Sequence, residues 1–147
     1  MKTKLLWKSL PKNLDPHGFT FTLGKWHKHN GKLEMCESGF HACENAVDAI
    51  GYVACEKLAL VEVKGKHLKQ DNKQCWQEMK LVKVWNWNKK DSVSLAIFAA
   101  ELVIDIYEKE YPKDKRPRKA IEAAKRFLKN PTEANRKKAY QAARAAE

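Results

Sequence analysis

The chain lacks the long apolar run that a membrane-spanning helix requires. Its longest candidate segment, Val93 to Ile106, is interrupted by Glu101 and Asp105, whereas a spanning helix needs about 20 consecutive apolar residues. The first ten residues contain lysines but no apolar stretch of the length found in secretory signals. These absences predict a cytoplasmic protein that has no membrane partner.

Glycine and proline are also scarce, with six and five residues among 147. Apolar residues make up 44% of the chain and include five tryptophans, a composition that argues against a disordered protein. The length fits one domain, or one compact body with a helical appendage. The four cysteines are expected to stay reduced, because an intracellular compartment disfavours disulfides.

Acidic residues are rare in the C-terminal quarter. From Lys113 onward there are twelve basic residues and four acidic ones, so the last 35 residues carry +8 of the total charge of +11. Such a one-signed field predicts an anionic partner, either an acidic protein surface or a nucleic acid. The alternative is an ordinary solvated helix face. The candidate contact residues are Arg116, Arg118, Lys119, Lys125, Arg126, Arg136, Lys137 and Lys138.

The first ninety residues have the patterns of short strands. Alternation over Phe19–Leu23, an Asn30-Gly31 turn and a second run over Leu33–Cys36 together predict a hairpin. Asn45 is a suitable N-cap for a short helix over Ala46–Val53, with Val47, Ile50 and Val53 as inward-facing positions. Further strands are expected over Gly39–Cys43, Leu58–Val63 (ending at Gly65) and Trp76–Trp85.

The remainder is typical of helices. Asp91 is a candidate cap for a helix over 92–110, a second helix is predicted over Pro117–Lys129, and Asn130-Pro131 is a start signal for a third. The first of these helices has a wide apolar face formed by Leu95, Phe98, Ala99, Leu102, Val103 and Ile106. The expected fold is α+β, with a small antiparallel sheet and one short helix in a β-rich domain over 1–90 and a basic three-helix domain over 91–147.

Two tryptophans are candidate aromatic anchors. Trp26 is expected near the tip of the predicted hairpin, where a large ring either anchors an interface or simply belongs to a solvated turn. Trp87 follows the last predicted strand, together with Trp85. These rings either cover the junction between the two halves of the chain or offer a stacking platform for bases.

Cysteine and histidine residues offer two weaker possibilities. Cys36, His41 and Cys43 lie within eight residues, and Cys55 or Cys75 could complete a tetrahedral zinc shell. The spacing is not that of paired zinc knuckles, so buried thiols and a hydrogen-bonded histidine are the alternative. Cys43 could also pair with His17, His27 or His67 as a nucleophile, although no local motif supports that pair. We therefore expect no metal and no cofactor.

Two stretches resemble known families. Gly39-Phe-His-Ala-Cys43 with Glu44, Asn45 and Asp48, followed by a Leu-Val-Glu-Val-Lys-Gly strand, resembles a family of phage and prophage proteins over about residues 5–85. The segment Ala96–Ala124, which contains Asp114-Lys-Arg-Pro-Arg-Lys-Ala-Ile-Glu-Ala-Ala, is similar to the helical immunity proteins of polymorphic-toxin systems. These resemblances imply a mobile-element protein that acts inside a host bacterial cell.

The element order around Gly39–Val63 is similar to that of ADP-ribosyltransferase-like folds, an analogy at the level of fold only. Such enzymes need a carboxylate on a late strand, and Glu78 is the one candidate catalytic residue at that place. The position two residues earlier holds Trp76 instead of the usual glutamine or glutamate. This departure makes catalysis the less favoured hypothesis.

The sequence thus favours a noncatalytic interaction protein that counters a host defence system, with an anti-CRISPR-like inhibitor as its concrete form. It would bind a bacterial defence nucleoprotein, or the nucleic acid within it, through the basic C-terminal helices. The alternatives are a nucleic-acid-binding protein without an inhibitory role and an ADP-ribosyltransferase-like enzyme.

Overall fold

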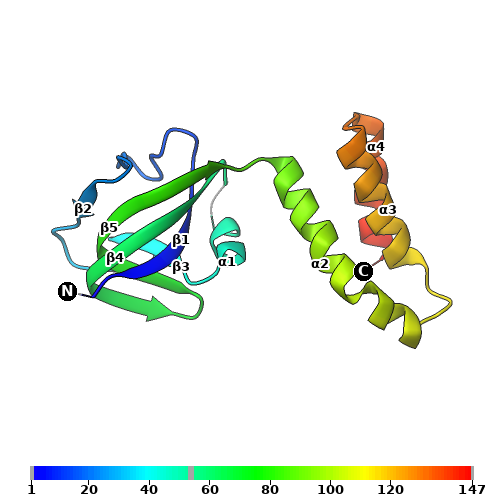
Figure 1. Ribbon diagram of the computed structural model, residues 1–147, viewed down its shortest axis with the longest axis horizontal. Helices are drawn as coiled ribbons and strands as arrows, with labels where there is room; N and C mark the ends of the chain where they lie inside the picture. Colours follow the sequence, from blue (N-terminus) through cyan, green and yellow to red (C-terminus); the bar gives the residue numbers. More distant parts are fainter. Residues whose placement is uncertain (1, 53–54, 147) are drawn as a thin grey trace. The chain divides into compact units, whose positions relative to one another are not determined.

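The computed structural model describes residues 2–52 and 55–146. It divides into two compact units, residues 1–88 and residues 89–147, which are described separately below. Within the described residues the first unit (the β-unit) contains an antiparallel five-stranded sheet and one short helix, and the second (the helical unit) contains three helices (Figure 1). The expected α+β class is confirmed.

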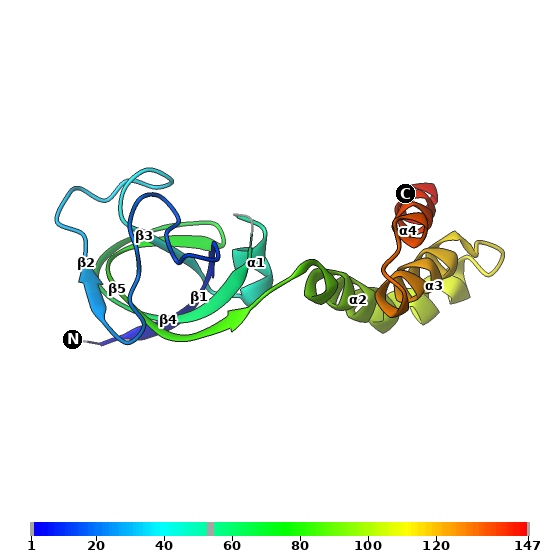
Figure 2. The same cartoon turned by 90° about the horizontal axis from the view of Figure 1, so that it is seen from above.

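The sheet of the β-unit closes on itself. Its strand order is β2-β5-β3-β1-β4, and β4 also pairs with β5, so that β1, β4, β5 and β3 form a ring (Figure 2). A single residue pair, Trp7 opposite Cys43, joins β1 to β3. The strands are β1 (Lys4–Leu10), β2 (Trp26–Lys28), β3 (Phe40–Cys43), β4 (Lys57–Gln70) and β5 (Lys73–Asn86).

Strands β4 and β5 form a long hairpin that holds the unit together. Its turn places Asp71 at φ 49°, a left-handed conformation that short polar side chains tolerate. The strands expected over Leu58–Val63 and Trp76–Trp85 are confirmed, but both are longer. Gly65 does not end its strand; it has φ 87° and lies at a register shift between Lys64 and His67, which is typical of a β-bulge. Strand β1 pairs with β4 only as far as Val63.

The hairpin predicted around Asn30-Gly31 is wrong. Neither 19–23 nor 33–36 forms a strand, and the short strand that does form here is β2, which pairs with the edge of β5. The apolar alternation over residues 19–23 reflects the packing of aromatic rings, because Phe21 is buried and its ring centroid lies 5.4 Å from that of Phe40. Strand β1 was not anticipated, since its lysines mask the alternation of Leu6 and Leu10.

Helix α1 (Ala46–Ile50) is shorter than expected. Asn45 is at the N-cap, but its side chain makes no capping bond; its Nδ2 donates to Asp48 Oδ2 at 3.2 Å instead. The inward position expected for Val47 is wrong, because this side chain is 63% exposed, whereas Ile50 packs against a small apolar cluster. Val53 lies outside the described residues.

The helical unit consists of α2 (Lys89–Glu110), α3 (Arg116–Lys129) and α4 (Glu133–Ala145), with α3 in contact with both other helices. Pro117 occupies the first turn of α3, where its missing N–H costs nothing. Two capping predictions are wrong. Asp91 lies inside the first turn of α2, and the N-cap of α4 is Thr132, whose hydroxyl accepts the Asn135 N–H at 3.2 Å. Asn130 is instead the C-cap of α3.

Helix α2 has apolar side chains on two opposite sides. Ile97 and Ile104, seven residues apart, are its buried residues. The wide apolar face expected from the sequence exists, but within the helical unit it is open to solvent. Its four large side chains, which we call the α2 apolar face, are between 56% and 67% exposed: Phe98, Leu102, Val103 and Ile106.

Candidate ligand pocket and partner-binding helices

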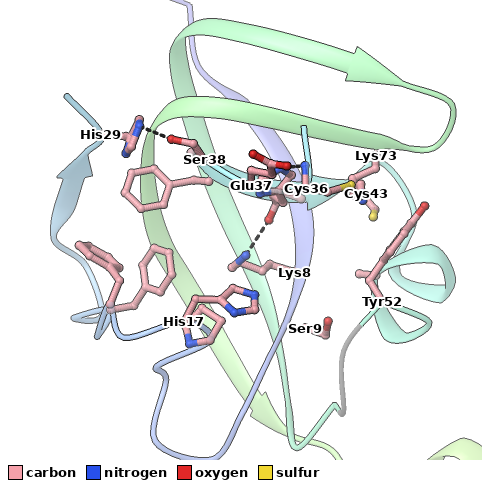
Figure 3. A pocket seen from close by; sticks show the side chains of 18 of the residues that line it. Lys8, Ser9, His17, His29, Cys36, Glu37, Ser38, Cys43, Tyr52 and Lys73 are labelled. Carbon is pink, nitrogen blue, oxygen red and sulfur yellow. Dashed lines mark hydrogen bonds between the residues drawn. The ribbon is translucent and has the colours of Figure 1, made fainter. Parts of the chain in front are cut away.

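A cavity of about 530 Å³ lies in the β-unit (Figure 3). Its walls come from β1, from the segment between β1 and β2, from the loop before β3, from β3 itself and from the start of β5. These elements meet because the sheet closes into a ring, which brings residues that are far apart in the sequence to one space. The cavity is therefore a product of the topology and could not be read from any single motif.

Lys8 reaches this cavity from the middle of β1. Side chains alternate along a strand, so Lys8 shares its side of β1 with the fully buried Leu6 and Leu10. Its Nζ donates to the backbone oxygen of His41 at 2.8 Å and lies 5.8 Å from the centroid of the Phe21 ring. Burial lowers the pKa of Lys8 to about 8, although Cys43 and Cys75 act weakly in the opposite direction.

The structure thus identifies a functional candidate that the sequence reasoning missed. The available signal was a lysine at an inward position of an alternating Leu-x-Lys-x-Leu strand. It was overlooked because this segment was not recognised as a strand.

His41 and Cys36 are joined by a hydrogen bond, with the Cys36 N–H donating to His41 Nε2 at 2.9 Å. An accepting Nε2 requires an unprotonated nitrogen, and burial, assisted by Lys8 and Lys73, lowers the pKa of His41 to about 4. His41 is therefore neutral near pH 7. Cys36 has φ 67°, and its Sγ accepts a hydrogen bond from Lys73 Nζ at 2.8 Å.

The candidate zinc ligands therefore have other partners. Across residues 2–52 and 55–146, no group of three or more His, Cys, Asp or Glu side chains is arranged to hold a metal ion. Burial raises the pKa values of Cys43, Cys55 and Cys75, which disfavours thiolates at these positions.

Two of the three histidines considered as partners for Cys43 are engaged elsewhere. His27 Nε2 accepts the Thr22 N–H at 3.0 Å, and His67 stacks on Trp76 with centroids 4.1 Å apart. His17 lines the same cavity as Cys43.

Trp26 is part of β2 and is not at a hairpin tip. The ammonium groups of Lys64 and Lys80 lie 4.2 and 4.9 Å from its ring centroid. Glu78 forms an ion pair with Lys64 at 3.4 Å and does not line the 530 Å³ cavity. It borders a shallower surface depression instead. Trp87 is half-buried against the apolar cluster formed by Cys43, Ala49 and Leu58.

The basic candidate residues of the helical unit fall into two groups. Four are paired with acids: Arg116 with Asp114, Arg118 with Glu108 and Asp105, Lys125 with Glu101, and Arg136 with Glu133. The other four, which we call the unpaired cations, form no ion pair within the described residues: Lys119, Arg126, Lys137 and Lys138.

The charge asymmetry of the sequence largely disappears when charge is counted by unit. Residues 1–88 carry 14 basic and 9 acidic residues, and residues 89–147 carry 15 and 9, so the two units have net charges of +5 and +6. The reason is that the acids of α2 belong to the same unit as the basic helices. Three of the four ion-paired cations above are matched by acids from α2 or the turn that follows it.

Comparison with protein families assigns the first unit. Residues 4–92 match the model of a family described as a domain of unknown function, DUF7666, and this match covers more than half of the chain. The chain belongs to the DUF7666 family. The DUF7666 region contains the ring-shaped sheet and every residue that lines the cavity.

Residues 84–147, which include all three long helices, match a second model, described as "Imm-5 like putative immunity protein". This match fits an immunity or inhibitor-type role that involves a protein partner. No curated protein and no solved structure matches the chain. In the described part of the chain, none of the helices combines the length and the apolar character needed to cross a membrane.

Proposed function

We propose that this protein is an immunity-type inhibitor from a phage or other mobile element, which binds a protein partner without catalysis through its helical unit. In its most specific form, the partner is a bacterial defence nucleoprotein, as for an anti-CRISPR protein. The proposal is supported by the similarity of residues 84–147 to an immunity-protein family and by the surface of the helices.

The α2 apolar face is the observation on which the proposal rests. Four large apolar side chains follow one another along one side of a helix, and each is more than half exposed within its unit. Soluble proteins rarely leave such a row in contact with water unless it is an interaction surface. The ion pairs on α3 fix that helix on the other side of α2, because Arg118 and Lys125 bind acids of α2.

The unpaired cations define the chemistry of the partner. Lys119 and Arg126 are seven residues apart on α3 and therefore lie on one side of that helix, two turns apart. Lys137 and Lys138 add two further charges on α4. We expect the α2 apolar face to pack against an apolar part of the partner and the unpaired cations to contact an acidic part of its surface. The partner is accordingly a protein that presents an apolar groove and an acidic surface.

The test is a pulldown from a bacterial lysate with the full chain as bait, carried out in parallel with and without nuclease. The captured protein is then purified and titrated with the full chain. We expect a nuclease-resistant complex of fixed stoichiometry and a loss of the partner's activity at saturation. Capture that disappears with nuclease, with an affinity that falls steeply with salt, would indicate nucleic-acid binding instead and overturn the proposal.

Two variants locate the interface. The triple change Phe98→Ser, Leu102→Ser and Ile106→Ser should abolish binding, whereas Leu5→Ser, Leu23→Ser and Leu68→Ser, at exposed apolar positions of the β-unit, should leave it unchanged. Reversal of the four unpaired cations to glutamate should mainly slow association, because exposed charges steer the encounter of two proteins. Its matched control reverses the exposed Lys2, Lys12, Lys25 and Lys66. Equal losses in a variant and its control would argue against this surface.

A further inference from the structure

Lys8 is a cation on the side of β1 that carries the apolar Leu6 and Leu10. Its neighbours on the same side of β1, Leu6 and Leu10, are 1% and 0% exposed. Its Nζ makes one hydrogen bond, to the backbone oxygen of His41, and forms no ion pair within the described residues. Lys8 itself is partly buried, and even partial burial of an ammonium without a neighbouring carboxylate is unfavourable, because the lost hydration is not offset by an opposite charge.

The surroundings of Lys8 are positively charged. Lys28 and Lys73 line the same cavity, in which Figure 3 shows the side chain of Lys8. Of the described lining residues, Glu37 alone has a carboxylate. The effect of this field is visible at His41, whose pKa is lowered to about 4 by burial and then by the two lysines. Among the described lining residues, three lysines therefore accompany a single carboxylate, which leaves the cavity with an excess of positive charge.

Aromatic rings form much of the rest of the wall. The centroid of Phe19 lies 5.1 Å from that of Phe21 and 5.3 Å from that of Phe40. Phe21 and Phe40 are buried, while Phe19 remains 38% exposed and lines the cavity. Tyr52 also lines it and is 47% exposed, with Lys73 Nζ 4.4 Å from its ring centroid. A volume of about 530 Å³ is within the range of small-molecule sites.

We propose that this cavity binds a small molecule that combines one planar ring with one phosphate or carboxylate group. The anionic group lies against Lys8, and the ring lies against Phe19 and its neighbours. The site belongs to the DUF7666 region and is independent of the partner-binding surface of the helices.

Calorimetry on the full chain at pH 7 tests this proposal with six probes. Adenosine monophosphate and indole-3-acetate combine a ring with a phosphate and a carboxylate, respectively. Adenosine and inorganic phosphate supply the parts of the first alone, and indole and acetate supply the parts of the second. We expect at least one ring-bearing anion to bind with a Kd below about 1 mM, and at least about tenfold more tightly than either part alone. The better of the two identifies the preferred anion. Failure of both ring-bearing anions would overturn the proposal.

The variant Lys8→Met removes the ammonium but keeps the length of the side chain. We expect it to lose at least about tenfold in affinity, as for a lost charged hydrogen bond. The matched control is Lys64→Met, because Lys64 is bound to Glu78 and lies outside the cavity; it should bind as the unmodified chain does. Unchanged binding by Lys8→Met would contradict the site.

A second measurement does not depend on how the variant folds. Dimethylation of the lysines with a ¹³C label allows the titration of Lys8 to be followed by NMR in the otherwise unmodified chain. An anion bound beside the ammonium favours its protonated form, so the pKa of Lys8 should rise when the tightest probe is added. A Lys8 resonance whose titration is unaffected by a bound probe would place that probe elsewhere and overturn the assignment.

Discussion

The two units treat charge and apolar surface in opposite ways. The β-unit buries its apolar side chains inside a ring of strands but also places the Lys8 ammonium there without an acid. The helical unit pairs many of its cations with nearby carboxylates but leaves the α2 apolar face in contact with solvent. Each departs from the usual pattern at one place, and each departure is costly for an isolated domain. The two candidate functional sites are therefore the places that lower the stability of their units: the cavity around Lys8 in the β-unit and the α2 apolar face of the helical unit.

The largest effect is expected from the core of the ring. Leu81 is fully buried, and Leu81→Ala should lower the free energy of unfolding of the β-unit by about 2–5 kcal/mol. All five tryptophans lie in residues 1–88, so their fluorescence follows this unit alone, while helical circular dichroism follows chiefly the other. We expect the fluorescence transition in urea to move and the helical one to stay. Coincident shifts would show that the two units unfold together.

A second prediction concerns the partly buried ammonium of Lys8. The folded pKa of Lys8 is about 8, below its ordinary value of 10.5, so between these values the unfolded chain binds more protons than the folded one. Stability should therefore rise from pH 8 to pH 10.5, by up to about 3 kcal/mol.

The comparison of urea midpoints for the unmodified chain and Lys8→Met isolates this contribution. The other ionisable groups around the cavity are the same in both proteins, so the comparison isolates Lys8; these groups include His17, His41, Cys43, Lys73 and Cys75. The variant should be the more stable protein at pH 7, and the difference should vanish above pH 10. A difference that does not depend on pH would show that the ammonium is well solvated.

A smaller effect should follow from the loss of the cap on α4. Thr132→Ala removes the hydroxyl that accepts the Asn135 N–H, which typically costs about 1 kcal/mol. Thermal unfolding followed at 222 nm should shift downward for the helical unit only. Thr132→Ser retains the acceptor and should behave nearly as the unmodified chain; an equal loss with serine would show that packing, and not the cap, stabilises this end.

The smallest effect is expected on the α2 apolar face. Phe98 is 61% exposed, so Phe98→Ser should change the free energy of unfolding by no more than about 0.5 kcal/mol. By contrast, Ile97→Ser, at the neighbouring buried position, should be clearly destabilising. The two unfolding curves, recorded side by side, separate the face that packs from the face that is available to a partner. Similar losses for both would indicate that Phe98 is covered.

Local patterns predicted the long helices and the strands over Leu58–Val63 and Trp76–Trp85, because these depend on near neighbours in the sequence; the pairing of the two strands into a hairpin was not predicted. The apolar spacing of α2 and the β-branched run after Leu58 were sufficient for that. The cavity was beyond prediction, because it depends on the pairing of Trp7 with Cys43 and of β3 with β5, contacts between distant segments. The ion pairs of Arg118 and Lys125 were not predicted for the same reason, since their acids come from the preceding helix.

The bulge at Gly65 has a consequence for association. Beyond Val63 the outer edge of β4 has no neighbouring strand in the described residues, so its backbone groups could template the addition of a foreign strand. This stretch contains three lysines, Lys64, Lys66 and Lys69, and the bulge interrupts its regular spacing of donors and acceptors. Charge and irregularity are the usual protections of an exposed edge. This stretch of β4 is thereby protected against the addition of a strand from another copy of the chain.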